Sequence, residues 1–208
     1  IGGYETEPQS LFVGGAVRNT LLQESVTDID VATQFMPEEI IQKLDHAGIK
    51  SIPTGIEHGT VTAVLDKKTF EITTLRHDVK TDGRHADVAF TNDWLEDAKR
   101  RDFTMNTLLA DISGNIYDPT GVGVKGLEAR QVIFVGNPAT RIAEDYLRIL
   151  RFFRFFAVYG EGEPDGAALA ACSGAADKII ELSRERITQE LLKILAVPNP
   201  CNVLEIML

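Results

Sequence analysis

Near its start the sequence reads LFVGGAVR at residues 11–18 and TDIDVAT at residues 27–33, and these two stretches decide the fold. The largely apolar residues 10–13 predict a short buried strand. Gly14-Gly15 end that strand, because glycine tolerates the backbone conformations of a tight turn, and residues 16–22 then predict a helix.

Residues 28–33 alternate polar and apolar side chains, which predicts a second strand. Asp28 and Asp30 then point to the same face, since strand side chains alternate with period two. Two like charges repel unless a cation lies between them, and Mg²⁺ is the hard cation that carboxylates favour. Glu71, on a strand predicted at 69–75, could supply a third carboxylate. The alternatives are a solvated strand end for the pair and an exposed strand position for Glu71.

The turn formed by Gly14 and Gly15 comes before a helix that carries Arg18. Such a turn lets a phosphate approach the backbone, and an arginine adds a fork of donors. The alternative is a glycine-rich turn beside a surface arginine. The spacing fits neither the dinucleotide fingerprint nor the Walker loop.

A third group of polar residues lies in the stretch RRDFTMN at residues 100–106, within a helix predicted at 94–109. Arg101, Asp102 and Asn106 fall within about one helical turn and offer donors and an acceptor to a sugar and phosphates. The alternative is a charged helix start, with Asp102 as its cap and the arginines solvated.

The most unusual helix is predicted at 141–159 and contains EDYLRILRFFRF at residues 144–155. Glu144, Arg148 and Arg151 share one face, and Asp145 lies three residues before Arg148. A surface helix held by pairs four residues apart is the alternative. Arginines interleaved with phenylalanines are nevertheless not typical of a solvated face.

The remaining pattern predicts an α+β protein. A helix is expected from Pro37 to about Ala47, followed by strands at 60–66 and 69–75 that turn at Lys67-Lys68. A polar segment at 77–89 predicts a mobile loop, and residues 111–118 predict a short hairpin. Only helices are expected from residue 141 onward, at ranges 141–159, 166–172, 175–182, 184–196 and from 202. We therefore predict a mixed α/β head at 1–137 and an all-α module at 138–208.

Composition narrows the classes of protein. The 208 residues are 44% hydrophobic, which is ordinary for a globular chain, and no apolar run reaches the ~20 residues of a membrane span. Two cysteines predict no disulfide framework, so we expect a reducing, cytoplasmic setting. A net charge of −10 argues against a general phosphate binder, although arginines cluster locally. There is no initiator Met and the chain stops inside an apolar run, so we expect a fragment.

Taken together, these stretches resemble the class II tRNA nucleotidyltransferases, or CCA-adding enzymes, and the related bacterial poly(A) polymerases. The motifs follow one another in the family's order over nearly the whole chain. Each motif by itself is a weak signal, and the resemblance rests on their succession. The matching stretches are LFVGGAVR (11–18), TDIDVAT (27–33), HGTVT (58–62), RRDFTMN (100–106), DPTG (118–121), EDYLRILRFFRF (144–155) and LSRERI (182–187).

The resemblance implies a polymerase-β-like nucleotidyltransferase head with a mixed sheet and flanking helices, followed by a helical neck. It assigns the metal-binding catalytic carboxylates to Asp28 and Asp30, which we expect to hold two Mg²⁺ ions. It also assigns the triphosphate cradle to Gly14, Gly15 and Arg18, the ribose-reading segment to Arg101, Asp102 and Asn106, the base template to Asp145 and Arg148, and further phosphate contacts to Arg151 and Arg154.

The resemblance also makes residues 77–89 the family's flexible loop and helix 182–195 a brace for the template helix. Two departures are visible. Asn19 stands where the family usually has Asp, and Gly121-Val122-Gly123-Val124-Lys125 is looser than the usual Gly-Gly form. The family's helical body and tail, which grip the tRNA acceptor stem, are expected beyond Leu208.

The function that follows is addition of CMP and AMP, from CTP and ATP, to the 3′ end of tRNA. Asp145 can accept from the exocyclic amine of cytosine or adenine while Arg148 donates to the ring nitrogen; uracil and guanine would leave such groups unpaired, at ~1–3 kcal/mol each. Poly(A) polymerase, CC-only and A-only addition are alternatives in the same class, and the 77–89 loop, which is not shortened, disfavours CC-only addition. A non-catalytic RNA-binding module is the alternative of another class, and a dinucleotide-binding domain is weaker still because the third glycine is absent.

Overall fold

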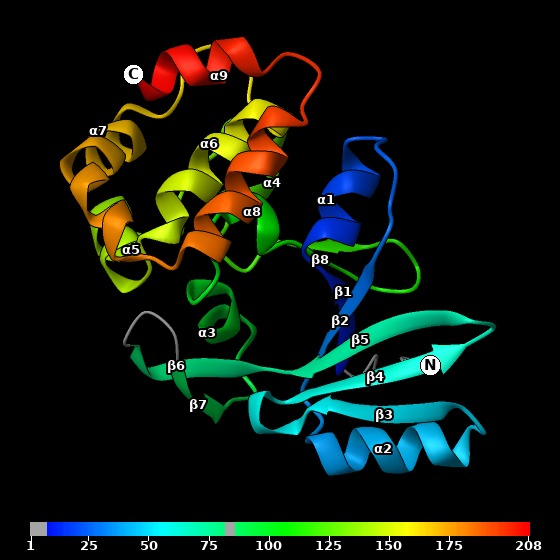
Figure 1. Ribbon diagram of the computed structural model, residues 1–208. Coiled ribbons are helices and arrows are strands. Elements are labelled where there is room, and N and C mark those ends of the chain that lie inside the picture. Colours follow the sequence, from blue (N-terminus) through cyan, green and yellow to red (C-terminus); the bar gives the residue numbers. More distant parts are fainter. Residues whose placement is uncertain (1–7, 82–85) are drawn as a thin grey trace. The chain divides into compact units, whose positions relative to one another are not determined.

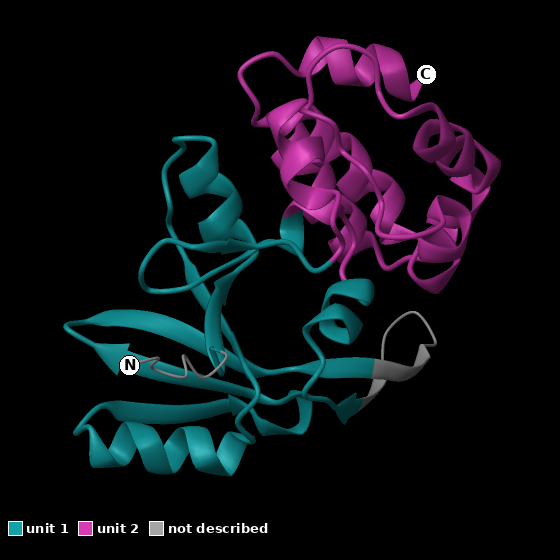
Figure 2. Ribbon diagram, turned by 180° about the vertical axis from the view of Figure 1, so that it is seen from behind, with its two compact units in different colours: residues 1–79, 88–100, 106–119 teal, residues 80–87, 101–105, 120–208 magenta. Residues whose placement is uncertain are grey.

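The structure is a computed structural model that describes residues 8–81 and 86–208. Its contacts divide the chain into two compact units, which Figure 2 shows in different colours. Unit 1 comprises residues 1–79, 88–100 and 106–119, and unit 2 comprises residues 80–87, 101–105 and 120–208. Residues 80–87, 101–105 and 120–137 are thus grouped with the helices after residue 138, and the division at residues 137/138 stays a prediction.

The first elements of unit 1 are those that the glycine turn predicts. Strand β1 (Ser10–Val13) leads into helix α1 (Gly15–Leu21), and strand β2 (Ile29–Thr33) follows. Gly14 has φ 68° and ψ −126°, a conformation that side-chain-bearing residues rarely adopt. The two adjacent glycines therefore allow the chain to leave the strand and enter the helix without an intervening loop.

Unit 1 is built on one sheet, which within the described residues has seven strands in the order β3-β4-β5-β2-β1-β8-β9 (Figure 1). The pair β2–β5 is parallel, and every other neighbouring pair is antiparallel. The sheet is therefore mixed, as expected. The remaining bounds are β3 Lys50–Gly55, β4 Thr60–Leu65, β5 Lys68–Thr74, β8 Leu109–Ala110 and β9 Ile116–Tyr117, with a 3₁₀ turn η1 at Ile56–His58.

One face of the sheet carries a compact apolar core. Leu11, Val13, Ala32 and Leu109 are buried there together with Leu75, and Trp94 packs against them. Helix α2 (Pro37–His46) begins at a proline, as predicted, and packs against β3 and β4. The backbone N–H of Met36 donates to Glu39 Oε2 at 2.9 Å, so an acidic side chain caps the start of this helix.

The predicted hairpin between residues 60–66 and 69–75 is confirmed, but its turn lies one residue earlier. Asp66 and Lys67 have φ values of 49° and 64° and form the two-residue turn. Strand β3 was not predicted, because it is an exposed edge strand and contains Pro53.

Within the range 77–89, the described residues form strands where a loop was predicted. Strands β6 (Arg76–Thr81) and β7 (Ala86–Phe90) form a separate two-stranded sheet. Residues 82–85 of the predicted loop lie outside the described residues.

The predicted helix at 94–109 is also wrong, since helix α3 spans only Trp94–Lys99. A 3₁₀ turn, η2 (Thr104–Asn106), and strand β8 occupy the rest of the range. Phe103 forms an antiparallel β-bridge with Phe134, and the N–H of Thr104 donates to the carbonyl of Ile133 at 2.8 Å. Tertiary pairing therefore overrides the local helical pattern here.

In the described part of unit 2, the chain from residue 141 onward is helical, as predicted. The single helix expected at 141–159 is instead two, because Asp145 adopts extended backbone angles (φ −155°, ψ 107°) between α5 and α6. The helices are α4 Gly123–Glu128, α5 Pro138–Glu144, α6 Leu147–Tyr159, α7 Gly166–Gly174, α8 Arg184–Leu195 and α9 Pro200–Met207, with a 3₁₀ helix η3 at Ala176–Glu181.

Aromatic side chains form the centre of unit 2. The ring centroid of Phe103 lies 4.8 Å from that of Phe134 and 4.9 Å from that of Phe155. Phe134 and Phe152 stack with centroids 5.8 Å apart. The phenylalanines that interrupt the arginines of α6 are therefore core residues, and they anchor the 101–105 segment to this helix.

Candidate active site

The candidate carboxylates lie on neighbouring strands of unit 1. In the parallel pair β2–β5, Asp30 is in register with Glu71, and in the antiparallel pair β1–β2 it is in register with Val13. Asp28 precedes β2 by one position and accepts a hydrogen bond from Thr27 Oγ1 at 3.1 Å. Asp30 and Glu71 therefore belong to the same side of the sheet, and Asp28 lies just outside the strand.

The carboxylates of Asp28 and Asp30 are oxygen ligands of the kind that a divalent cation requires. Asp28 is exposed and Asp30 is partly exposed, so both can meet a hydrated ion. Among residues 8–81 and 86–208, no group of three or more His, Cys, Asp or Glu side chains is arranged to hold a metal. Two carboxylates suffice for Mg²⁺, which keeps several waters and borrows substrate phosphates. The pair fits that ion, and Glu71 remains a prediction.

Arg18 is buried beside the glycine turn rather than solvated at the surface. Its side chain is 7% exposed, and Nη1 donates to Oδ1 of Asn106 at 2.6 Å. The Oδ1 atom of Asn19 accepts from Nε at 3.0 Å and from Nη2 at 2.9 Å. The structure thus brings together two residues from separate predicted groups, Arg18 of the cradle and Asn106 of the ribose-reading segment.

The other two members of the ribose-reading segment belong to unit 2. Oδ1 of Asp102 accepts from its neighbour's backbone N–H at 2.8 Å, and Oδ2 accepts from Nε of Arg151 at 2.9 Å. The carbonyl of Arg101 accepts from Nη2 of Arg141 at 2.8 Å. The three predicted residues therefore do not share a helical turn, and Asn106 is held separately in unit 1.

The two template residues are adjacent but are engaged with different partners. Asp145 Oδ1 accepts from the N–H of Leu147 at 3.1 Å, and its Oδ2 accepts from Nη2 of Arg186 at 2.7 Å. Arg148 pairs with Glu144 and donates to the carbonyl of Arg141 at 2.7 Å. Both predicted template groups already have partners: the carboxylate lies between α5 and α6, and the guanidinium lies in the first turn of α6.

Arg151 and Arg154 take part in a buried charge network. Burial alone would lower the pKa of Arg151, but the carboxylates of Asp102, Glu190 and Asp145 raise it above the ordinary range. Arg154 donates to Glu190 and lies over the ring of Phe155, 4.5 Å from its centroid. Both arginines are therefore bound within unit 2, and a phosphate would have to compete with these carboxylates.

Glu190 was missed by the sequence-based reasoning. Burial would raise its pKa, but the hydrogen bond and charge of Arg154, aided by Lys193 and Arg151, hold the pKa below the ordinary range. The available signal was its position on the buried side of helix α8, four residues before Ile194. Helix α8 packs on α6, and Arg186 of the LSRERI stretch adds a hydrogen bond to Asp145; that α8 braces a template helix stays a prediction.

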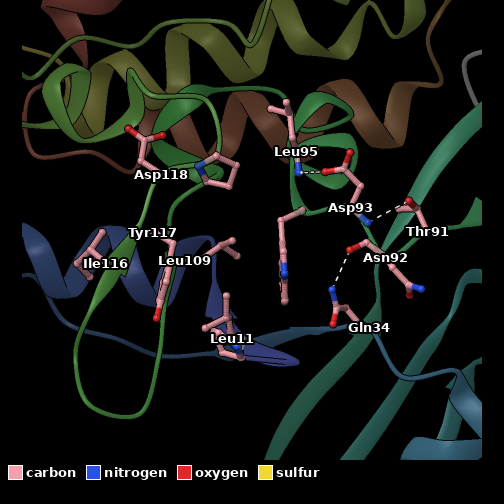
Figure 3. Close-up of a pocket in the computed structure, with 13 residues that line it drawn as sticks. Leu11, Gln34, Thr91, Asn92, Asp93, Leu95, Leu109, Ile116, Tyr117 and Asp118 are labelled. Carbon is pink, nitrogen blue, oxygen red and sulfur yellow. Dashed lines mark hydrogen bonds between the residues drawn. The ribbon is translucent and has the colours of Figure 1, made fainter. Parts of the chain in front are cut away.

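A separate pocket of about 1060 Å³ opens in unit 1 at the other end of β2 (Figure 3). Leu11 and Leu109 line its floor, and Gln34 donates to the carbonyl of Asn92 at its edge. Asp93 caps the start of helix α3, where its side chain accepts a hydrogen bond from the N–H of Leu95 at 2.8 Å. None of the described residues that line the pocket is Lys or Arg.

The mixed sheet with its glycine turn and strand-borne carboxylates defines a nucleotidyltransferase head. The model of the poly(A) polymerase head domain matches residues 10–133, which is more than half of the chain. The chain therefore belongs to the poly(A) polymerase head-domain family.

Two curated relatives and one solved structure resemble most of the chain. It is 45% identical over 198 residues to the mitochondrial CCA tRNA nucleotidyltransferase 1 of Danio rerio, covering 93% of this chain and 45% of that protein. It is 36% identical over 207 residues to the CCA-adding enzyme of Geobacillus sp. (strain WCH70), and the match covers 99% of this chain and 49% of that protein. The Bacillus stearothermophilus CCA-adding enzyme in complex with CTP matches with a TM-score of 0.83 and 34% identity, covering 95% and 47%. The chain thus spans about half the length of these relatives.

Across the described ranges, the helices are too short or too polar to cross a lipid bilayer.

Proposed function

We propose that the protein transfers nucleotides to the 3′ end of RNA, adding CMP and AMP from CTP and ATP to tRNA. The observation that carries the proposal is the register of β2 with β5, which brings Asp30 beside Glu71, with the exposed Asp28 one position before the strand. The names of the curated relatives and the CTP complex of the matching structure support the same activity.

In the proposed mechanism, Asp28 and Asp30 would hold Mg²⁺, which supplies charge neutralisation and a lower pKa for the attacking hydroxyl. The RNA 3′-hydroxyl gives its proton to solvent water, its oxygen forms a bond to the α-phosphorus, and the bond from that phosphorus to the leaving pyrophosphate breaks. Arg18 binds the triphosphate behind the glycine turn, where Asn106 and Asn19 hold its guanidinium. The protein thus mainly positions the reactants and stabilises the developing charge.

Base selection is assigned to Asp145 and Arg148. Asp145 accepts from the exocyclic amine of cytosine or adenine, and Arg148 donates to the adjacent ring nitrogen. Because Arg186 and Glu144 hold these groups before substrate arrives, little ordering is needed on binding. Asp102 binds the ribose, and Arg151 and Arg154 bind phosphates only by exchanging their present partners.

Several assignments remain part of the proposal. We assign the catalytic head to residues 1–137 and the helical neck to residues 138–208. The compartment is proposed to be cytoplasmic, although one of the similar proteins is named as mitochondrial. The poly(A) polymerase head-domain match favours a second candidate function, addition of many AMP residues to an RNA 3′ end.

The test measures incorporation of each labelled NTP into tRNA that lacks CCA, with Mg²⁺ and the protein at its natural length. CTP followed by ATP, with UTP and GTP refused, is the expected result. Long tracts from ATP alone would replace the proposal with poly(A) polymerase. A single AMP added only to tRNA ending in CC would indicate an A-adding enzyme. No incorporation of any nucleotide would overturn the catalytic proposal and leave an RNA-binding module.

A further inference from the structure

Asn19 contacts two functional segments of unit 1 with one side chain. Its Oδ1 accepts from Nε and Nη2 of Arg18 at 3.0 Å and 2.9 Å, and its Nδ2 donates to the carbonyl of Ser25 at 2.8 Å. One orientation of the amide satisfies both partners, since a guanidinium only donates and a carbonyl only accepts. The oxygen of the neutral amide therefore accepts from Arg18, and its nitrogen donates to Ser25.

The loop at 22–27 forms hydrogen bonds with both the main chain and the side chain of Asn19. Gln23 has a φ of 59°, which a residue other than glycine adopts only where the surroundings hold it. The N–H of Glu24 donates to the backbone carbonyl of Asn19 at 2.8 Å. The main chain of Asn19 therefore binds Glu24, and its side chain binds the next residue, Ser25.

The same loop leads directly to Asp28, which the sheet does not fix. The register of β2 begins at Asp30 against β1, where its partner is Val13, and at Ile29 against β5. Asp30 therefore has a strand neighbour on each side, whereas Asp28 lies outside both ladders. Its position depends on the chain that enters β2, and Asn19 holds that chain.

We propose that Asn19 is a positioning residue for nucleotidyl transfer, which orients Arg18 through its carbonyl oxygen and the approach to Asp28 through its amide nitrogen. The proposal rests on the proposed function, in which Arg18 binds the triphosphate and Asp28 is catalytic. A carboxylate at position 19 would still accept from Arg18. It could not donate to Ser25, and it would place negative charge against that carbonyl oxygen.

The test compares Asn19→Asp with Asn19→Ala in the protein at its natural length. For Asn19→Asp, we expect KM for CTP to stay within about two-fold and kcat to fall on the order of ten-fold, the usual effect of one lost hydrogen bond. For Asn19→Ala, we expect both a similar fall in kcat and a several-fold rise in KM, because Arg18 also loses its acceptor. Gln42→Glu adds the same charge on the exposed side of α2 and is expected to change neither constant.

Amide hydrogen exchange gives a readout that does not depend on activity. Asn19→Asp should speed exchange at residues 22–28 while the melting temperature and the exchange of β4 and β5 stay unchanged. Unchanged exchange in the loop, an unchanged kcat, or identical kinetic changes in the two variants would each overturn the proposal. If the unaltered protein incorporates no nucleotide, the proposed function fails, and the exchange experiment still decides whether Asn19 holds the loop.

Discussion

The carboxylates of β2 and the charged side chains of α6 are held in place by different means. The backbone ladders of two neighbouring strands fix Asp30, and the nearby Asp28 remains exposed to solvent. On α6, side-chain partners engage Arg148, Arg151 and Arg154 in turn, and much of the network is buried. A ligand can therefore reach the exposed carboxylate of Asp28 directly, whereas it must exchange partners to reach Arg151 and Arg154.

This difference has an energetic consequence. Removing an exposed strand carboxylate leaves the fold intact, because that group contributes little to stability. Removing one member of the α6 network leaves its partner buried without a counter-charge, which is costly. Variants of the first region should therefore change chemistry alone, and variants of the second should change stability as well.

The largest effect is expected for Asp28→Asn. The substitution keeps the size of the side chain and removes the charge that would neutralise a divalent cation, so nucleotide incorporation should fall by at least about a hundred-fold. The melting temperature should stay within about 2 °C, since the side chain is exposed. Single-turnover incorporation and thermal unfolding check the two parts.

Asp45→Asn, on the exposed side of α2, removes the same charge from unit 1 and should retain full activity. If Asp28→Asn kept activity within a few-fold of the unaltered protein, Asp28 would not be a catalytic carboxylate. The statement that variants near β2 change chemistry alone would then fail.

The next largest effect is expected for Glu190→Ala, which leaves the guanidinium of Arg154 without its carboxylate. Both side chains are largely buried, so the free energy of unfolding should fall by about 3 kcal/mol. Denaturant unfolding measures this change. Glu205→Ala removes an exposed charge from α9 and serves as the control.

The double variant Glu190→Leu with Arg154→Met sharpens this result. It replaces both charges by apolar groups, so it should recover a large part of the lost stability. If the double variant lost as much stability as the single variants Glu190→Leu and Arg154→Met lose together, the two side chains would not be coupled.

A smaller effect is expected for Arg186→Met, which removes the partner of Asp145 across 41 positions of sequence. The carboxylate keeps its contact with the N–H of Leu147 but loses its lateral support. Preference for CTP over UTP, measured as the ratio of kcat/KM values, should fall about ten-fold. Arg184→Met, an exposed position on the same helix, is the matched control, and equal behaviour of the two variants would rule out this role.

The two regions also differ in how far the sequence predicts them. The β1–α1–β2 segment and its carboxylates follow from period-two alternation and from a glycine turn, which are local signals. Helix α3 ends early because Phe103 pairs with Phe134, a contact that no local pattern contains. Likewise, spacing rules place Glu144 near Arg148 but cannot connect residues as distant in sequence as Arg154 and Glu190.

The partners of Arg18 show the same limit on a smaller scale. The sequence places Gly14, Gly15 and Arg18 together, since they are neighbours, and it places Asn106 in another group. The structure joins Asn106 to Arg18 across 88 positions. Residue types near a turn can thus be predicted to bind phosphate, whereas the side chains that orient them depend on the completed fold.

The smallest effect concerns the acid stability of the α6 network. The ion pair with Arg154 holds the pKa of Glu190 below its ordinary range, so ionised Glu190 stabilises the folded state at pH values above the unfolded pKa, about 4.5. This contribution is lost as the pH falls through the lower, folded pKa. In Glu190→Gln the group cannot ionise, so the gap in unfolding free energy between the two proteins should be constant above about pH 5.5 and narrow below about pH 4.5. Denaturant unfolding at a series of pH values measures this gap. If this gap stays constant down to pH values where the protein unfolds, the ionisation of Glu190 does not stabilise the folded state. The difference between α6 and the carboxylates near β2 would then rest on packing and not on charge.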